Sequence, residues 1–389
     1  MDYRGVLDYI EAYWPHVIKE QAADDGPLIG LPRPFAAPSH EPIFHEQFYW
    51  DSYFISLGLI DTDLEYLVVD MAENMFYLLE RFGIIPNANR FYFLSRSQPP
   101  ILTSMLKLAL EVKRRRGDDD LEVTAERWWS LAEREYREVW MGESFPHVRQ
   151  VFRGLSRYFD ANYLNDLIAC ESGWDHSTRC RGDWLSHLPI DLNAMLYRYE
   201  TDFAERAKQR SNDAAAEHWQ SVAARRSRVA GELCWDESQD FFFDFDFVSG
   251  HIEPTVSLAG FYPLWAGMVS EARAARLVER WLPKLRFPGG MVTSLSSQET
   301  KQWAYPNGWA PLQWIVAEGL ERYGFKGEAQ EIRRLWCDTC AQAFGRTGVL
   351  HEKYNVVDPS QPPEPGLYGT IEGFGWTNGV FVDFAKKLV

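Results

Sequence analysis

Two acidic residues lie where a carboxyl group could do chemistry. Asp175 follows Gly173 and Trp174, and Glu352 lies in the short apolar and aromatic stretch 348–356. Desolvation against an aromatic ring raises the pKa of a carboxyl group and favours a general acid. Inverting glycoside hydrolysis needs one protonated and one ionised carboxyl group on opposite faces of a sugar ring. We therefore take the two residues as a candidate catalytic pair.

Each acid also has a simpler structural interpretation. Aspartate at a loop-to-helix boundary is commonly an N-cap. Glu352 lies between His351 and Lys353, where a surface salt bridge would account for it. These interpretations are favoured for either residue in isolation. The catalytic hypothesis depends on the two carboxyl groups meeting at one site.

The chain is unusually rich in aromatic residues, with 16 Trp, 18 Tyr and 24 Phe among 389 residues. Such rings fill cores, and the faces of Trp and Tyr also stack on sugar rings. Segment 41–54 places Trp50 and Asp51 among further aromatic residues. This segment is too aromatic for a solvated turn and too charged for a core, so we expect it to form the wall of a site.

Three further segments combine polar and aromatic residues in the same way. Segment 84–102 ends in a double proline that should open the next helix, leaving Arg96 and Gln98 just before its N-terminus. Donors at that position would converge on sugar hydroxyls. Segments 302–314 and 370–381 are dense in aromatic residues and glycine. Packing of a barrel mouth is the alternative role for both, and sugar contact is the favoured one.

The elements that would position these segments are helices. Apolar residues recur at helical spacing, and the segments between them are rich in Gly, Pro, Asn and aromatic residues. The alternation recurs about six times, which suits helical hairpins in a ring with the loops of one end forming a cup. We predict an all-α barrel that spans residues 1–389 as one domain. The helical tracts are 64–79, 102–110, 121–140, 191–234, 271–284, 309–324 and 327–345, and the loops are 28–50, 84–100, 171–190, 285–308 and 347–376.

Charge and composition exclude several classes of protein. The net charge is −16, and a field of that sign repels phosphate backbones, so we expect no nucleic-acid partner. No stretch is long and apolar enough to cross a membrane. The first 20 residues are too charged for a signal peptide, and the five cysteines cannot all pair, so we expect a cytoplasmic protein. The oligomeric state is left open.

Neither a cofactor nor a metal is expected from the sequence. Cys337 and Cys340 form a lone C-x-x-C within a helical pattern, without a second pair or a histidine partner. The glycines of segment 289–295 lack the spacing and the strand-to-helix context of a dinucleotide fingerprint. The expected partner is a small-molecule sugar substrate.

Six of these motifs, taken together, resemble the trehalase family of glycoside hydrolases. They occur in the order found in that family and span residues 44 to 380. The motifs are FHEQFYWDSYF (44–54), PNANRFYFLSRSQPP (86–100), ESGWDHSTR (171–179), QWAYPNGWAPLQW (302–314), HEKYNV (351–356) and EGFGWTNGV (372–380).

The resemblance implies an (α/α)6 toroidal barrel that hydrolyses an α-glucosidic bond with inversion. It implies that Asp175 is the general acid and Glu352 the general base. Residues at positions that match the glucose-binding end of the family's pocket are Phe44, Trp50, Asp51, Asn87, Arg96, Trp309 and Glu372, and Gln98, Trp174 and Gln302 accompany them in the same motifs as further substrate-binding candidates.

Three departures from the family pattern concern the leaving group. His40, Glu41, Pro42 and Ile43 replace the family's Pro-Gly-Gly-Arg, so an arginine is absent. The segment after 153–160 is shorter than the family's Arg- and Glu-rich loop, and Ala304 replaces an aspartate. Nearby arginines that could compensate are Arg153, Arg157, Arg179 and Arg181.

The substrate that the resemblance favours is α,α-trehalose, cleaved to glucose. A hydrolase of glucosylglycerate, mannosylglycerate, glucosylglycerol or another small α-glycoside is the first alternative, because the departures leave the leaving group open. The second alternative is a catalytically silent sugar-binding barrel. The presence of both Asp175 and Glu352 argues against it.

Overall fold

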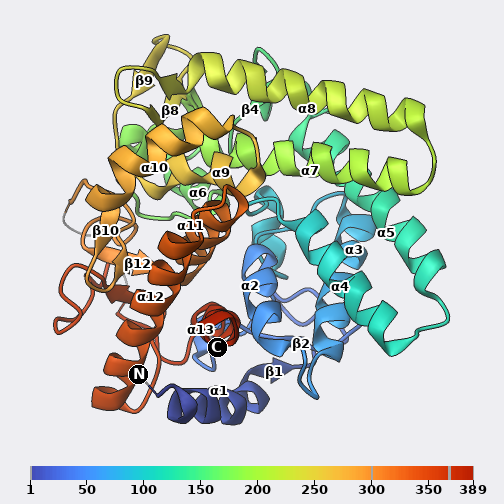
Figure 1. The fold of residues 1–389 in the computed structure, drawn as a ribbon. Coiled ribbons are helices and arrows are strands. Elements are labelled where there is room, and N and C mark those ends of the chain that lie inside the picture. The colour runs from blue at the N-terminus through green and yellow to red at the C-terminus, as the bar shows by residue number, and fades with distance from the viewer. Residues whose placement is uncertain (1, 299–300, 367–368, 389) are drawn as a thin grey trace.

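The structure is a computed structural model that describes residues 2–298, 301–366 and 369–388. Within that part of the chain, six helices form an inner ring in which α13 packs against α2 and closes the circle (Figure 1). The ring continues from α2 through α4, α7, α9 and α11 back to α13. The inner helices are α2 (Tyr49–Leu59), α4 (Leu102–Arg116), α7 (Ile190–Gln209), α9 (Tyr262–Ala266), α11 (Ala310–Arg322) and α13 (Gly375–Leu388).

A second set of helices surrounds the inner ring. The described part of the chain therefore has the predicted all-α architecture, an (α/α)6 barrel. Tyr3 precedes α1 and its ring lies 5.6 Å from that of Phe381, which joins the first helix to the last. The outer helices are α1 (Arg4–Val17), α3 (Tyr66–Phe82), α5 (Leu121–Glu135), α8 (Asp213–Leu233), α10 (Glu271–Leu285) and α12 (Lys326–Thr347). A π-helix (Tyr136–Trp140) extends α5, and the short α6 (Asn165–Glu171) lies in the loop before α7.

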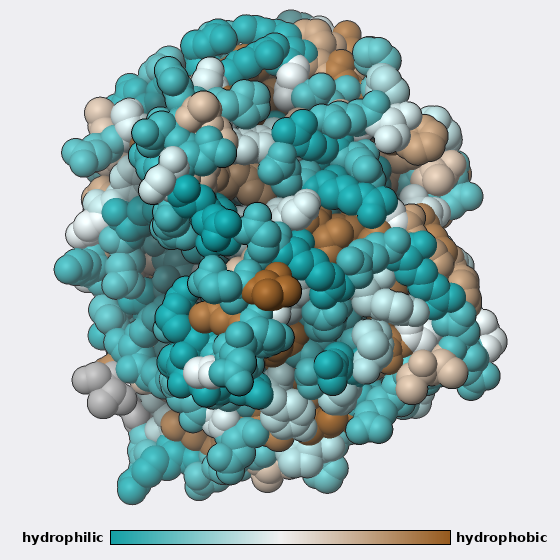
Figure 2. All heavy atoms as spheres, turned by 90° about the vertical axis from the view of Figure 1, so that its right-hand side faces the viewer, coloured by the Kyte–Doolittle hydropathy of each residue, from teal (hydrophilic) through white to brown (hydrophobic). Residues whose placement is uncertain are grey.

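Burial differs between the two rings as the sequence requires. In α2, ten of eleven residues are buried, because the helix packs on neighbours around its whole circumference. In α10, the six buried residues recur every three or four positions and form one stripe that faces inward. Outer helices can therefore present charged residues to water. The face in Figure 2 is largely hydrophilic, with apolar side chains in several separate places.

The strands are short antiparallel pairs in the loops between helices. The pair that matters for the site is β12 with β13, in which Trp309 lies opposite Lys353. The strands are β1 (Ile18–Lys19), β2 (Phe35–Ala36), β3 (Gln150–Phe152), β4 (Leu155–Ser156), β5 (His187–Leu188), β6 (Trp235–Asp236), β7 (Phe241–Phe242), β8 (Asp244–Asp246), β9 (His251–Glu253), β10 (Arg286–Phe287), β11 (Gly290–Met291), β12 (Asn307–Trp309) and β13 (Lys353–Asn355).

The helical tracts were predicted correctly in position, with three differences at their ends. The tract 191–234 is two helices, since the chain reverses at Ser211, whose φ of 55° is left-handed. The double proline does not open α4, which begins at Leu102. Part of segment 370–381 is helical rather than loop, because α13 begins at Gly375. Helices α1, α2, α6, α9 and α13 were not predicted.

Candidate active site

A cavity of about 250 Å³ lies among the loops that precede α2, α4, α7, α11 and α13. It is smaller than the pockets of about 300–1,000 Å³ that hold drug-sized ligands, which suits a small sugar. Both predicted catalytic residues line it. Its lining residues are Ile43, Phe44, Phe48, Trp50, Asp51, Asn87, Tyr92, Phe93, Arg96, Gln98, Cys170, Gly173, Asp175, Trp303, Trp309, Glu352, Phe374 and Trp376.

Stacked tryptophans form the rigid base of this cavity. The rings of Trp303 and Trp309 are parallel, with an interplanar angle of 1° and centroids 3.9 Å apart. Trp174 also stacks on Trp303, with ring centroids 5.5 Å apart. Trp50 and Trp376 add tilted or edge contacts to the same cluster. The aromatic density of the sequence therefore gives a fixed wall, part of which faces the cavity.

Asp175 lies in a turn after α6, and its backbone position depends on a glycine. Gly173 has a φ of +71°, and a Cβ there would lie 2.8 Å from the ring of Trp50, so a side chain would be excluded. The side-chain amide of Gln302 donates a 3.0 Å hydrogen bond to Oδ2 of Asp175. Burial raises the pKa of Asp175, and charge interaction with His176 and the Gln302 bond oppose part of that rise. A raised pKa suits a group that must donate a proton. The structural alternative of a helix N-cap does not apply, because Asp175 precedes no helix directly.

Glu352 enters the cavity from the residue before β13. Its backbone N–H donates to the carbonyl of Ile371, and its own carbonyl accepts from Nε1 of Trp376. The carboxylate lies 2.8 Å from Nζ of Lys353. This ion pair is buried, with side chains 1% and 0% exposed, so it is not the surface salt bridge of the simpler interpretation. A buried cation beside Glu352 stabilises the ionised form that a general base needs.

Asp51 is a third carboxyl group in the cavity wall. It lies in the first turn of α2 and is 4% exposed. Burial raises the pKa of Asp51 well above its ordinary value, and the charges of Glu352 and Asp175 raise it further. Each of the predicted catalytic residues is thus close enough to interact with Asp51. The three carboxyl groups, from α2, from the loop after α6 and from the residue before β13, therefore lie close together in the cavity wall.

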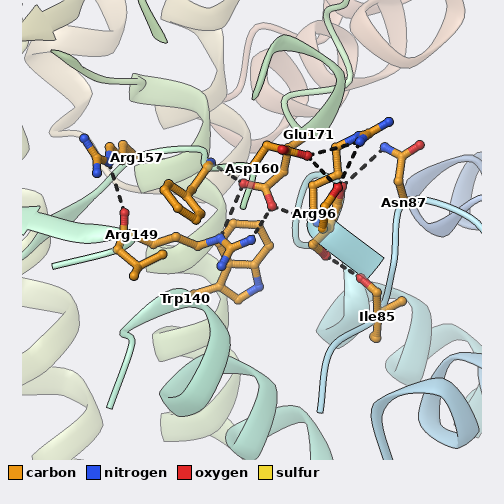
Figure 3. Close-up of polar contacts among 12 residues, drawn as sticks. Ile85, Asn87, Arg96, Trp140, Arg149, Arg157, Asp160 and Glu171 are labelled. Atoms are coloured by element: carbon orange, nitrogen blue, oxygen red, sulfur yellow. Dashed lines mark hydrogen bonds and ion pairs between the residues drawn. The ribbon is translucent and has the colours of Figure 1, made fainter. Parts of the chain in front are cut away.

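Two side-chain amides and one guanidinium group come from the segment between α3 and α4. Gln98 accepts a 3.0 Å bond from the backbone N–H of Trp50, which fixes the start of α2. Asn87 donates to the carbonyl of Cys170. Nη1 of Arg96 lies 3.1 Å from Oδ2 of Asp160 (Figure 3). The guanidinium is therefore held by a buried carboxylate behind the cavity wall.

Comparisons with known proteins identify the family of this chain. The family model described as "Trehalase" matches residues 2–163 and 156–388. The chain is 32% identical over 422 residues to a periplasmic trehalase of Xanthomonas campestris, covering 97% of this chain and 72% of that protein. The chain belongs to the trehalase family.

Solved structures place this trehalase-family member among glycosidases of the same fold. The neutral trehalase of Saccharomyces cerevisiae superposes with a TM-score of 0.81 and 27% identity, covering 92% of this chain and 74% of that one. A mannosylglycerate hydrolase from Thermus thermophilus superposes with a TM-score of 0.65 and 22% identity, covering 90% and 96%. At that identity the second likeness shows the fold alone. The family is one of glycoside hydrolases, so the chain is a hydrolytic enzyme.

The expectation of a cytoplasmic protein is wrong. The curated relatives that resemble this trehalase-family chain, from Xanthomonas campestris and Citrobacter koseri among others, are named periplasmic trehalases. The expectation depended on N-terminal charges and on an odd number of cysteines. The cysteines do not report the compartment, because all five are free and four of them are buried, where they serve as packing groups. Among the described helices, none is both long and apolar enough to cross a membrane.

Most of the predicted site residues line the cavity, and three do not. Trp174 is buried behind Trp303, and Gln302 is buried beneath Asp175, so both act on the cavity from behind. Glu372 is exposed, and the structure does not bring it into the wall. The lining residues among the predictions are Asp175, Glu352, Phe44, Trp50, Asp51, Asn87, Arg96, Gln98 and Trp309.

Several lining residues were missed although each stands beside a predicted one. Phe48 precedes Trp50 by two positions, and Tyr92 and Phe93 precede Arg96 within one motif. Phe374 and Trp376 follow Glu372 in the sequence and face the cavity in its place. The aromatic count of each motif was the signal that could have identified them.

The four arginines proposed to compensate for the missing family arginine do not reach the cavity. Arg179 is buried between Asp191 and Asp244, 2.7 and 2.8 Å from their oxygens. Arg153 pairs with a glutamate of α8, Arg157 donates to backbone carbonyls, and Arg181 pairs with a glutamate of β9. Each therefore has a structural partner elsewhere. Within the described part of the chain, no group of three or more His, Cys, Asp or Glu could hold a metal ion.

Proposed function

We propose that this chain hydrolyses α,α-trehalose to glucose with inversion at one anomeric carbon. The observation that carries the proposal is that Asp175 and Glu352, 177 residues apart in the chain, line one small cavity. The relatives named trehalase, both bacterial and fungal, support the choice of trehalose as the substrate. The substrate contacts proposed are the predicted residues that line the cavity.

In the proposed reaction, Asp175 gives its proton to the glycosidic oxygen while the bond from that oxygen to C1 breaks. Glu352 takes a proton from a water molecule, whose oxygen bonds to C1 from the opposite face. One glucose leaves with its α configuration, and the attacked sugar becomes β-glucose. Burial of Asp175 keeps its proton available, and Lys353 stabilises the ionised base.

Asp51 and the tryptophans would hold the sugar that is attacked. The buried Asp51 carboxyl lies beside both catalytic groups and can bond to sugar hydroxyls in either protonation state. Trp309 lines the cavity and is fixed by its stack on Trp303. These contacts would place C1 between the acid and the base.

Proton NMR of the first turnovers tests this proposal. Trehalose should give α- and β-glucose in equal amounts before mutarotation mixes them. Appearance of α-glucose alone would mean retention and would exclude single displacement by water. Absence of glucose from any α-glucoside would favour the silent sugar-binding barrel.

A further inference from the structure

The outer rim of the cavity differs in chemistry from its floor. Floor residues are almost fully buried, with Trp309 and Glu352 at 0% and 1% exposure. Rim residues are open to solvent, with Ile43 at 56% and Tyr92 at 57%. A sugar bound at the floor would therefore leave its aglycone, the group attached through the glycosidic oxygen, against the rim.

A run of aromatic rings follows this rim and ends on the buried Phe374. Tyr92 lies 4.3 Å from Phe93, and Phe93 lies 6.1 Å from Phe48. Phe48 in turn lies 5.8 Å from Phe44, which meets Phe374 edge-on at 5.2 Å. The rings come from two short 3₁₀ turns, Pro42–Phe44 and Phe91–Ser95, from the residue before α2, and from the loop before α13. The rim thus offers apolar surface where an aglycone would lie.

The described residues that line the cavity offer an anion one cation, and that cation is already paired with a carboxylate. Among its described lining residues, Asp51, Asp175 and Glu352 are acidic and Arg96 is the one cation. Arg96 is already paired with the buried Asp160 (Figure 3). Arg90, whose guanidinium lies over the ring of Tyr92 at the rim, pairs with the buried Glu46. An anionic aglycone would meet no cation without a carboxylate partner among these residues, because the four other candidate arginines are bound elsewhere.

We propose that Ile43, Phe44, Phe48, Tyr92 and Phe93 form a leaving-group subsite for neutral aglycones with an apolar face. The chain then hydrolyses α-glucosides of aromatic alcohols as well as trehalose, and it discriminates against anionic aglycones such as glycerate. The proposal rests on the proposed function, since it uses the same acid and base. The bond from C1 to the aglycone oxygen breaks, water supplies the hydroxyl to C1, and Asp175 supplies the proton to the alcohol.

Two matched substrate pairs test the subsite. Benzyl and methyl α-glucoside both release an unactivated alcohol but differ in the ring that would lie on the rim. We expect kcat/KM for the benzyl compound to be higher by about tenfold or more, the effect of burying one aromatic group. Glucosylglycerol and glucosylglycerate differ in one carboxylate. We expect about a tenfold preference for the neutral glucosylglycerol.

Rim variants then assign these preferences to the named residues. Ile43→Ser and Tyr92→Ser change side chains that are more than half exposed, so the fold should tolerate them. Each should lower the benzyl-to-methyl ratio about fivefold or more. Val123→Ser removes an apolar side chain that is 76% exposed on the outer helix α5 and serves as the matched control. Ile43→Arg should raise the rate on glucosylglycerate relative to glucosylglycerol.

The outcomes separate this inference from the proposed function. α-Glucosyl fluoride, whose leaving group is too small to contact the rim, reports the acid, base and inner subsite alone. Hydrolysis of the fluoride and of trehalose, with equal rates for benzyl and methyl α-glucoside, would overturn the subsite and leave the proposed function intact. A preference for glucosylglycerate over glucosylglycerol would also overturn it. No hydrolysis of the fluoride or of trehalose would overturn the proposed function itself.

Discussion

The side-chain amide of Gln302 donates a 3.0 Å hydrogen bond to Oδ2 of Asp175, across 127 residues of sequence. The loop after α6, which carries Asp175, and the loop before β12, which carries Gln302, are also joined by their backbones. Ser177 and Trp303 form a parallel bridge between them. Burial raises the pKa of Asp175, and the Gln302 bond lowers it in part because it favours the ionised form. Gln302 therefore tunes the proposed acid from behind the cavity wall.

Removal of this hydrogen bond should shift the pH dependence of the reaction. Gln302→Leu takes away the donor, so the pKa of Asp175 should rise further. A general acid acts in its protonated form, which a higher pKa preserves to higher pH. The basic limb of kcat/KM should therefore move to higher pH, whatever happens to the maximum rate. Gln330→Leu, at an exposed position of α12, is the control. A basic limb that stays in place would remove Gln302 from this role.

Substitution of the two catalytic candidates should affect activity and stability differently. Asp175→Asn and Glu352→Gln should each lower turnover on trehalose by about 10²-fold or more, since each removes a proton-transfer group. Asp175→Asn should leave the melting temperature nearly unchanged, because that side chain is partly open to the cavity. Glu352→Gln should lower the melting temperature, because it removes one charge of a buried ion pair. Wild-type turnover in either variant would exclude that residue as acid or base.

The sequence predicted which segments line the cavity better than it predicted the orientation of their side chains. Asp175, Glu352 and Arg96 were predicted because their motifs keep residue types that chemistry requires. Glu372 was assigned to the wall in the same way, but its backbone bridges His351 and its side chain is exposed. A motif fixes which segment reaches the site, whereas the direction of each side chain depends on the local backbone path.

The groups behind the wall could not be predicted from the sequence, for a physical reason. Asp160 and Glu171 are fully buried. Asp160 pairs with Arg96, and Glu171 pairs with Arg149 and accepts a hydrogen bond from the backbone N–H of Ser97 (Figure 3). These partners are distant from the two acids in sequence. Their roles arise from tertiary proximity alone. Most of the helices, in contrast, follow from local apolar spacing, so the sequence alone predicts their positions and order.

A buried glutamate should make the stability of the fold depend on pH. Burial raises the pKa of Glu135 from 4.5 to about 7, although Tyr199, Tyr49 and Trp140 donate hydrogen bonds to it. Between these pH values the folded state keeps a proton that the unfolded state has lost. Stability therefore falls as pH rises from 4.5 to about 7, by on the order of 3 kcal/mol, and the loss is complete above that range.

Glu135→Gln should remove this fall in stability, because a glutamine does not ionise. The free energy of unfolding of both proteins, measured in urea from pH 5 to pH 8, tests it. We expect the wild type to lose stability relative to the variant as pH rises. Glu11→Gln, on the exposed side of α1, should follow the wild type. Parallel pH curves for wild type and Glu135→Gln would contradict the prediction.

The pairing of Arg96 with Asp160 should make substitutions of the two residues non-additive. Asp160 accepts from Arg96, from Ser95 at 2.7 Å and from the backbone N–H of Asn162 at 2.7 Å. Burial raises the pKa of Asp160, but these hydrogen bonds outweigh it, and the pKa is lowered overall. The carboxylate thus stays ionised and fixes a guanidinium that faces the cavity. Asp160 is a positioning residue that acts through Arg96.

A double-mutant cycle on kcat/KM for trehalose measures this dependence. Arg96→Lys keeps a positive charge but loses the planar fork, and should lower kcat/KM by about 1–3 kcal/mol of transition-state binding. Asp160→Asn should act in the same direction and mainly through KM, because it releases the guanidinium without removing it. If Asp160 acts only through Arg96, the double variant should be no worse than Arg96→Lys alone. Arg153→Lys, in a surface ion pair with side chains 42% and 43% exposed, should leave kcat/KM unchanged. Additive losses, or an effect of Asp160→Asn on kcat alone, would show that Asp160 contributes by another route.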